Sequence, residues 1–264
     1  MTQRAKWTAA ALAAALLVSA TGCKTSPAIR QGAVLGNGTK PVTAPLDPAT
    51  LGTLTGTVHF NGKPPARVKI DMSQDPACSM MAGTNLTEQY VVNDGGLANV
   101  YVSIKSGPAV AMTAPSTSNA PTVMDQTGCR YAPHVVALMR GNSVEFRNSD
   151  PTMHNIHTMP VLAGEAPTDL AQAPRGPAQW VQYKEPVTME PVRCNNHPWM
   201  EAFINVSDTP FFAVTDGSGH FTIDGLPAGH YVLAVAHEKL GEQTMEITVK
   251  PHQTTQADFS YTAK

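Results

Sequence analysis

The sequence predicts an all-β protein, and three observations lead to that prediction. Short runs of alternating apolar and polar residues recur from Leu51 onward, each bounded by turn residues. Proline and glycine are frequent, with 22 and 20 residues, and they fall mainly between these runs. Long helical patterns are scarce after the first 20 residues. With 264 residues, the chain is long enough for one large or two ordinary domains with apolar cores.

The expected strands have the spacing that is typical of β-sandwiches. The first run, residues 57–60, ends at Asn61-Gly62, a pair that favours a hairpin turn. Residues 161–178 are rich in alanine and proline and carry no pattern, so they predict a loop or flap. The other runs are residues 100–104, 134–139, 143–147, 180–183, 187–193, 202–206, 211–215, 220–223, 231–236, 245–249 and 258–261.

Residues 1–22 have the features of a signal peptide. Arg4 and Lys6 precede an apolar run, residues 7–18, which is shorter than the roughly 20 residues that span a bilayer. The run leads to Ser-Ala-Thr-Gly-Cys at residues 19–23, which resembles a bacterial lipobox with Ala20 in the usual leucine position. The resemblance implies lipidation of Cys23; the alternative is ordinary signal-peptidase cleavage that leaves Cys23 incidental.

The first residues after Cys23 indicate where the protein is expected to reside. By the same resemblance, Lys24 in the position after the cysteine implies retention at the outer membrane. Residues 23–50 are rich in Thr, Pro, Ala and Gly without periodicity, and they predict a flexible tether. We therefore expect an exported, periplasmic protein, lipid-anchored to the outer membrane.

The charge balance gives no sign of a nucleic-acid partner. Removing Arg4 and Lys6 from the 18 basic residues leaves 16 against 20 acidic residues, a net charge of −4. Nucleic-acid binding requires a concentrated basic surface, which this balance disfavours.

Four side chains in the middle of the chain suggest a metal site. His154 is followed forty residues later by Cys194, then by His197 and Met200. Two imidazoles, a thiolate and a weak axial thioether are the donors of blue-copper sites. Thiolate and thioether suit Cu(I), and imidazole binds both oxidation states, so this donor mixture permits one-electron transfer with little rearrangement.

The sequence around these donors resembles the amicyanin branch of the cupredoxins. Cys-x-x-His-Pro-Trp-Met at residues 194–200 is similar to the C-terminal ligand loop, with Trp199 in place of Phe, and residues 154–157 are similar to the upstream ligand motif. The resemblance, which covers residues 130–206, implies a Greek-key sandwich and a copper ion cycling between Cu(I) and Cu(II). It implies that the ligands are His154, Cys194, His197 and Met200.

The resemblance also implies roles for the neighbours of the ligands. Asn155 would join the two ligand loops through a hydrogen bond to residue 195, where Asn195 replaces the more usual Ser or Thr. Electrons would leave at a surface formed by His197, Pro198 and Trp199. A structural zinc site is the chemical alternative, with His157 as a ligand in place of Met200.

The four cysteines are consistent with these assignments. Assigning Cys23 to lipid and Cys194 to copper leaves Cys78 and Cys129 as an even pair. In an oxidising compartment such a pair is expected to form a disulfide.

A second resemblance covers the sequence on either side. Residues 215–223 and 226–233 resemble the carboxypeptidase regulatory-like (transthyretin-like) β-sandwich, with its Leu-Pro-x-Gly turn, and residues 56–64 resemble its opening strand. The resemblance implies a sandwich split between residues 51–125 and 209–264, with a cupredoxin domain, residues 126–208, inserted in it. Two consecutive sandwiches are the alternative.

We expect from these patterns a membrane-tethered electron carrier without enzymatic activity, which serves redox partner proteins. The alternatives are a lipoprotein that holds or delivers copper, for which Met153 and Met159 beside His154 are suitable soft donors, and a structural module without metal.

Overall fold

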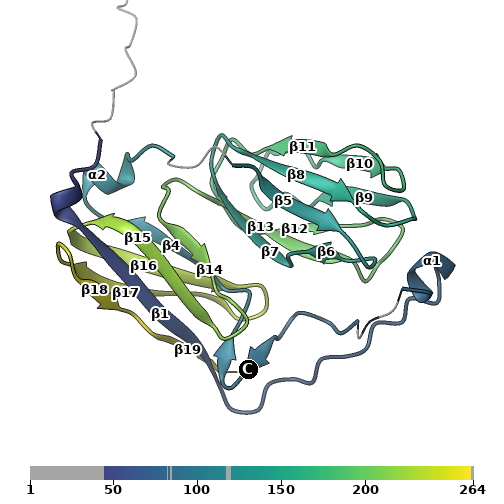
Figure 1. Cartoon of the computed structure of the whole chain (residues 1–264), viewed down its shortest axis with the longest axis horizontal. Coiled ribbons are helices and arrows are strands. Elements are labelled where there is room, and N and C mark those ends of the chain that lie inside the picture. The colour runs from purple at the N-terminus through teal and green to yellow at the C-terminus, as the bar shows by residue number, and fades with distance from the viewer. Residues whose placement is uncertain (1–44, 82, 84, 117–119, 263–264) are drawn as a thin grey trace, which may run out of the picture. The chain divides into compact units, whose positions relative to one another are not determined.

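The computed structural model describes residues 45–81, 83, 85–116 and 120–262 (Figure 1). Strands predominate there, and the three helices are short: η1 Pro48–Thr50, α1 Pro76–Ser79 and α2 Ala109–Met112. The predicted all-β class is confirmed. None of the helices in the described ranges is long and apolar enough to cross a membrane. The signal peptide, Cys23 and most of the expected tether lie outside the described residues; at the end of the tether, Asp47 accepts a hydrogen bond from Ala49 N and caps η1.

The strands form two sandwiches, which we call flanking and inserted. The flanking sandwich consists of β1 Leu51–Asn61, β2 Val92–Asn93, β3 Gly96–Leu97, β4 Tyr101–Ser106, β14 Phe212–Val214, β15 His220–Pro227, β16 Gly229–His237, β17 Gly241–Val249, β18 Thr254–Gln256 and β19 Phe259–Thr262. The inserted sandwich consists of β5 Thr122–Gln126, β6 Tyr131–Ala132, β7 Val135–Met139, β8 Ser143–Asn148, β9 His154–Thr158, β10 Asp169–Gln172, β11 Gln179–Gln182, β12 Val187–Arg193 and β13 Glu201–Ser207.

Strand pairing makes the flanking sandwich discontinuous in sequence. In one sheet β1 pairs antiparallel with β15 and also contacts β3, β18 and β19. In the other sheet β4 lies between β14 and β16, and β17 follows β16. The chain therefore leaves this sandwich after β4, forms the inserted sandwich, and returns to it at β14.

Strand β1 illustrates how the sequence forms the flanking core. Its residues alternate between buried and partly exposed, as expected for a strand with one face on a core. Leu54 and Val58 point into that core and are completely buried. Between them Gly56 allows close approach of the chain after β18, since a Cβ at this position would lie 1.9 Å from Ala257 O.

The inserted sandwich packs a five-stranded sheet, in the order β10-β9-β12-β13-β7, with a four-stranded sheet, β11-β8-β5-β6. Its core is separate from the flanking core and includes Phe146, Ile156 and Ile204. Strand β9 lies between β10 and β12, and the loop between β12 and β13 holds the expected cysteine and histidine ligands.

Three sequence-based expectations differ from the structure. Residues 122–125, assigned to the flanking module, belong to β5, which pairs with β8 of the inserted sandwich. Strand β10 lies within the stretch expected to be a loop, because its pairing with β9 compensates for its weak pattern. No hairpin forms at Asn61-Gly62 within the described residues; β1 pairs instead with β3 at His59↔Gly96.

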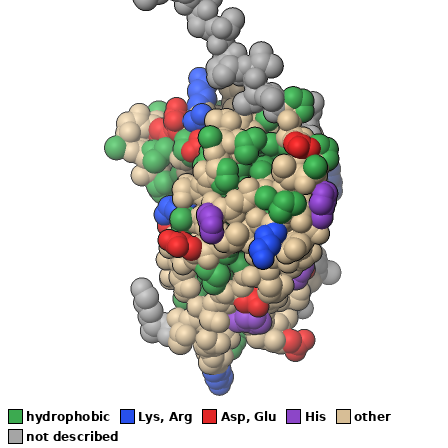
Figure 2. Space-filling view, turned by 90° about the vertical axis from the view of Figure 1, so that its left-hand side faces the viewer, with side chains coloured by type: hydrophobic (Ala, Val, Ile, Leu, Met, Phe, Trp, Pro, Cys, Tyr) green, Lys and Arg blue, Asp and Glu red, His purple; other side chains and the backbone are tan. Residues whose placement is uncertain are grey.

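The chain between β1 and β2 also contributes to the inserted core. Met72 and Cys78 are buried in it, and Ile70 and Met81 pack against it. We call residues 69–81 the capping segment. On the face drawn in Figure 2, basic side chains stand among acidic ones and form no continuous basic surface.

Candidate metal centre

The first candidate ligand begins a central strand. His154 is the first residue of β9, it is completely buried, and residues along β9 alternate in burial so that Ile156 shares its buried face. His157 has the opposite parity and is partly exposed. Pairing of β9 with β10 on one side and β12 on the other holds the backbone of His154 in place.

The other candidate ligands come from the short loop between β12 and β13. Two backbone hydrogen bonds close this loop: Cys194 N donates to Met200 O at 3.3 Å, and Met200 N donates to His197 O at 2.8 Å. Cys194, His197 and Met200 are all buried, with 4%, 2% and 1% of their surface exposed. Met200 packs in the same core as Cys194.

Three donor atoms converge inside the inserted sandwich. His154 Nδ1 lies 2.9 Å from His197 Nδ1. Cys194 Sγ lies 3.9 Å from His154 Nδ1 and 3.5 Å from His197 Nδ1. Atoms that share one metal ion at roughly 2.0–2.3 Å stand about 3–4 Å apart, so these separations fit a common ion.

The remote nitrogen of each imidazole is bonded to a carboxylate. His154 Nε2 lies 2.9 Å from Asp150 Oδ2, and His197 Nε2 lies 2.9 Å from Asp75 Oδ2. A carboxylate only accepts hydrogen bonds, so each Nε2 carries a proton, and each Nδ1 offers its lone pair to a metal ion once it carries no proton of its own. Carboxylate–histidine pairs of this kind fix the tautomer of metal-binding histidines.

The convergence favours a cation. Two nitrogen lone pairs facing each other, with a thiol sulfur beside them, repel one another unless a proton or metal ion lies between them. A proton satisfies one pair of donors, whereas a metal ion satisfies all three at once. The donor set therefore fits a metal ion that accepts both imidazole and thiolate, as copper and zinc do.

The electrostatics of the cluster agree with this. Burial opposes ionisation of the Cys194 thiol, yet hydrogen bonds, led by that from His154, lower its pKa to about 6. Burial likewise opposes charging of His154, but Asp150 and Cys194 outweigh it and raise the pKa of the imidazole to about 8. The hydrogen bond from His197 lowers the pKa of Asp75 to about 2. The thiolate is thus favoured near neutral pH.

Cys78 and Cys129 form a disulfide, with an S–S distance of 2.00 Å and a Cα–Cα distance of 5.6 Å. Two further groups of potential ligands contain these cysteines, but a disulfide sulfur is not a thiolate ligand. Among the described residues Cys194 is the one free cysteine, so the group His154, Cys194 and His197 is the one with an available thiolate.

The two asparagines are joined through a third residue rather than directly. Asn155 Nδ2 donates to Asp169 Oδ1 at 3.3 Å, and Asn195 Nδ2 donates to both Asp169 oxygens at 3.1 and 3.0 Å. The backbone N–H of Asn155 contacts Cys194 Sγ at 3.3 Å. The direct bond expected from Asn155 to residue 195 is replaced by this bridge, because Asp169 on β10 lies beside both.

His157, the alternative zinc ligand, lies outside the group of three. Its Nδ1 forms a 2.7 Å hydrogen bond with Asn195 Oδ1, so its ring helps to hold the ligand loop. Within the described residues, no metal-capable group includes His157.

The surface expected to pass electrons is more covered than the sequence indicated. Pro198 is exposed and Trp199 is half-buried, but His197 is buried. The Trp199 ring lies 5.1 Å from the His197 ring, and Trp199 Nε1 donates to Cys129 O at 3.0 Å. The capping segment covers the Nε2 edge of His197 through Asp75.

Sequence reasoning missed Asp75, Asp150 and Asp169. Asp150 had a detectable signal, because it lies four residues before His154 and metal-binding histidines usually pair with a carboxylate. Asp75 had none, because 122 residues separate it from His197.

Comparisons with known proteins identify one family model that matches part of the chain. The family model of the carboxypeptidase regulatory-like domain matches residues 194–262, which include β14–β19 and, before them, the ligand loop and β13. A search of curated proteins gave no match.

Several solved structures resemble part of the chain. A copper-containing nitrite reductase from Thermus scotoductus SA-01 is 22% identical, with 36% of this chain and 26% of that chain covered and a TM-score of 0.30. A Cu(I) form of an amicyanin variant is 19% identical, with 40% and 97% covered and a TM-score of 0.30. A purple cupredoxin from Nitrosopumilus maritimus is 18% identical, with 33% and 99% covered and a TM-score of 0.28. At these values the chemistry of the site rests on its own geometry.

Proposed function

We propose that the chain is an exported type 1 copper protein that carries single electrons in the periplasm. The observation that carries the proposal is the convergence of His154 Nδ1, His197 Nδ1 and Cys194 Sγ in a buried position. Met200, buried in the same core, would be the weak axial donor. A copper ion bound by this set supplies one-electron transfer between Cu(I) and Cu(II).

The protein holds the metal-donor atoms in fixed positions and shields them from water. Strand pairing fixes His154, and the two backbone bonds of the ligand loop fix Cys194 and His197. Each ring is also fastened at its outer edge by a carboxylate. Donors that do not move when the charge of the site changes keep the rearrangement energy small, and this suits a carrier.

Export and tethering are part of the proposal. The disulfide supports an oxidising compartment, since such bonds are rare in reducing ones. The lipobox-like sequence at Cys23 supports a lipid anchor, and Lys24 after it favours the outer membrane. Redox proteins of the envelope would be the partners, and we expect no enzymatic turnover and no nucleic-acid binding.

A second candidate function is the holding or delivery of copper. The burial of His197 under the capping segment favours it, because slow exchange suits a store. Exposed thioethers are present in the capping segment, where Met80 is 80% exposed, and next to His154 in sequence, where Met153 is 46% exposed. Two results together would favour this candidate: the protein transfers Cu(I) to a chelator, and its bound copper exchanges no electron with small redox reagents.

The visible spectrum of the full chain with one equivalent of Cu(II) tests the main proposal. We expect an intense thiolate-to-copper band near roughly 600 nm. Two histidines of β9 provide matched variants: His154→Ala should lose the band, whereas His157→Ala should keep it. Met200→Leu should keep the band and raise the midpoint potential. Loss of metal binding in His157→Ala with no change in Met200→Leu would replace the copper site by the zinc alternative.

A further inference from the structure

The outer edges of the two ligand histidines are held from different parts of the chain. Asp150 lies four residues before His154, so its contact is local. Asp75 is 122 residues from His197 and comes from the capping segment, which precedes the whole inserted sandwich in sequence. The contact between Asp75 and His197 therefore depends on the fold of the capping segment and not on local spacing. This raises the question of what the contact does for His197.

The Asp75 carboxylate is shared between the capping segment and the ligand histidine. Its Oδ1 accepts hydrogen bonds from the backbone N–H groups of Ala77 at 2.7 Å and Cys78 at 3.4 Å, and so caps α1. Its Oδ2 accepts from His197 Nε2 at 2.9 Å and from Thr152 Oγ1 at 2.8 Å. Contacts on both oxygens hold the carboxylate in one orientation, so it fixes the plane and tautomer of the His197 ring.

The disulfide joins the supports of both histidines. On one side, the N–H of Cys78 donates to Asp75, and Cys78 Sγ lies 3.7 Å from His197 Nε2. On the other side, the N–H of Cys129 donates to Asp150 Oδ2 at 2.8 Å, the oxygen that also contacts His154. The Cys78–Cys129 bond therefore links the two carboxylates that hold the two imidazoles.

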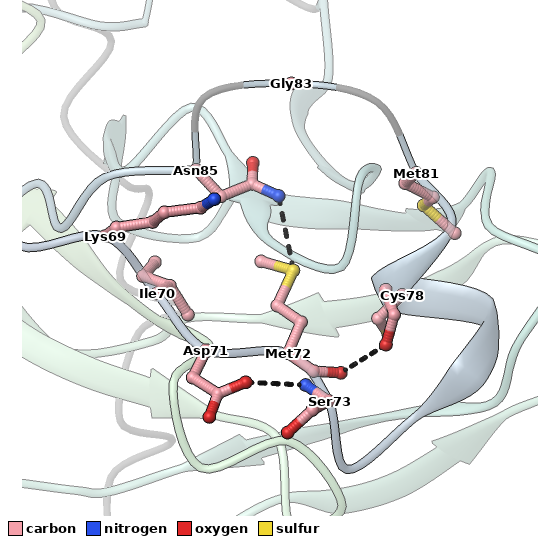
Figure 3. Close-up of a pocket in the computed structure, with 10 residues that line it drawn as sticks. Lys69, Ile70, Asp71, Met72, Ser73, Cys78, Met81, Gly83 and Asn85 are labelled. Atoms are coloured by element: carbon pink, nitrogen blue, oxygen red, sulfur yellow. Dashed lines mark hydrogen bonds between the residues drawn. The ribbon is translucent and has the colours of Figure 1, made fainter.

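The shape of the capping segment is preserved by contacts within it and by one contact from Asn85, which follows it in the chain. Ser79 Oγ donates to Met72 O at 3.0 Å, and Asn85 Nδ2 donates to Met72 Sδ at 3.2 Å. Asp71 Oδ1 accepts from Ser73 N at 2.9 Å. Figure 3 shows these contacts around a pocket of about 450 Å³ that the segment lines. Among the described residues Asp71 bonds to Ser73 and forms no hydrogen bond or ion pair with either histidine, so it serves as a matched control for Asp75.

We propose that Asp75 is a positioning residue of the metal centre, and that the Cys78–Cys129 disulfide is the clamp that keeps it on His197. The inference rests on the proposed copper site and assigns to the capping segment a role in tuning it. A carboxylate on Nε2 makes Nδ1 a stronger donor, which stabilises Cu(II) more than Cu(I) and lowers the midpoint potential. The segment also keeps water from the Nε2 edge, so it slows the loss of copper.

The test compares Asp75→Asn with Asp71→Asn in the full, copper-loaded chain. Both variants remove one negative charge from the same segment. We expect Asp75→Asn to raise the midpoint potential and to lower Cu(II) affinity about 10- to 100-fold, with the blue band retained. Asp71→Asn should match the wild type in both measurements. Equal potentials and affinities in the two variants would overturn the role of Asp75.

The clamp is tested with the double variant Cys78→Ser/Cys129→Ser. If the disulfide keeps Asp75 in place, this variant raises the potential in the same direction as Asp75→Asn and speeds copper capture by a chelator. Adding Asp75→Asn to it should then change the potential little further. A wild-type potential in the double variant would overturn the clamp and leave the role of Asp75 standing.

One measurement does not depend on copper. In the metal-free protein, ¹⁵N NMR should detect a protected Nε2–H proton on His197, lost in Asp75→Ala and kept in Asp71→Ala. A protein that has this proton but no band near roughly 600 nm would refute the copper function and support the positioning by Asp75. A blue protein without this proton would refute the positioning by Asp75 and support the copper function.

Discussion

The two sandwiches are built on similar strand patterns but differ in what they bury. The core of the flanking sandwich consists of apolar side chains such as Leu54, Phe221 and Leu233, and few polar side chains are buried on its strands and loops, Thr215 and His237 among them. The inserted sandwich has an apolar core too, but it also buries polar side chains on its strands and loops: Gln126, Asn148, Asp150, His154, Gln172, Glu190, His197 and Asn205. Buried polar groups destabilise a fold unless each is bonded, so their concentration in one sandwich indicates where function lies.

Bonding in the inserted sandwich shows how these groups are accommodated. Asn148 Nδ2 donates to the carbonyls of Thr152, Gln172 and Ala173 and so holds the turn before His154 against β10. Gln172 Nε2 in turn donates to Phe146 O at 3.0 Å. The difference teaches that the apolar core of the flanking sandwich can be specified by pattern, whereas the inserted sandwich also needs specific hydrogen-bond partners for the polar side chains that it buries.

The largest effect is expected from Cys194→Ser. It replaces the one thiolate of the site by a hydroxyl, so the blue band should disappear, and the copper-induced rise in Tm of the inserted sandwich should be lost. The flanking sandwich should be unaffected, because its core shares no residue with the site. Copper titration followed by absorbance and calorimetry measures both. A variant that keeps the band would contradict the role of Cys194.

Two matched substitutions, one in each core, test whether the two sandwiches are independent. Ile156 on β9 is completely buried in the inserted core, and Ile223 on β15 is 3% exposed in the flanking core. Each change to Ala should lower the free energy of unfolding by about 2–5 kcal/mol in urea titrations. Only Ile156→Ala should also weaken copper binding, because it loosens the strand that holds His154. Equal effects on copper affinity would mean that the two cores are not independent.

A buried carboxyl group gives the inserted sandwich a distinctive pH dependence. Burial, with Glu165 adding to it, raises the pKa of Glu190 from 4.5 to about 7. The folded state therefore binds the proton more tightly than the unfolded state, so stability is full below about pH 4.5 and falls as the pH rises to about 7. The loss is about 3 kcal/mol.

The variant Glu190→Gln should remove that loss. In urea titrations it should be more stable than the wild type at pH 8 and close to it at pH 4. A stability difference that is the same at both pH values would show that Glu190 does not titrate between them. Glu190 is not one of the candidate ligands, so the metal-free protein suffices for the measurement.

Sequence reasoning found the parts of the molecule that local pattern determines. The run at residues 187–193 coincides with β12, and the predicted donors His154, Cys194 and His197 converge because the ligand loop and β9 are short, regular elements. Asp75 was missed because it reaches the site through the tertiary fold and the disulfide rather than through spacing. The hairpin expected at Asn61-Gly62 was wrong. The chain turns there, with a φ of +88° at Gly62, but it then continues away from β1. Local turn chemistry fixes a bend and leaves the pairing partner to the rest of the fold.

The smallest effect at neutral pH is expected from the flanking sandwich's own buried titratable group. His237 is 2% exposed, its ring lies between those of Tyr90 and Tyr261, and its Nδ1 accepts a hydrogen bond from Lys239 N at 3.2 Å. Burial lowers the pKa of His237 from 6.5 to about 4, although the attraction of Glu238 opposes this and His134 adds to it. The neutral ring is therefore the form that the fold accommodates.

The sign is opposite to that of Glu190. Because the unfolded state binds the proton more readily, the contribution of His237 is fully present above about pH 6.5 and is lost as the pH falls to about 4. His237→Phe should therefore differ little from the wild type in its pH response above pH 7. Between pH 6.5 and 4 it should lose less stability than the wild type in urea titrations. A different outcome is that acid destabilises the wild type and His237→Phe equally while Glu190→Gln behaves as expected. His237 would then not contribute to the pH dependence of stability. Buried ionisable groups would control that dependence in the inserted sandwich alone, and the two sandwiches would differ more than their cores indicate.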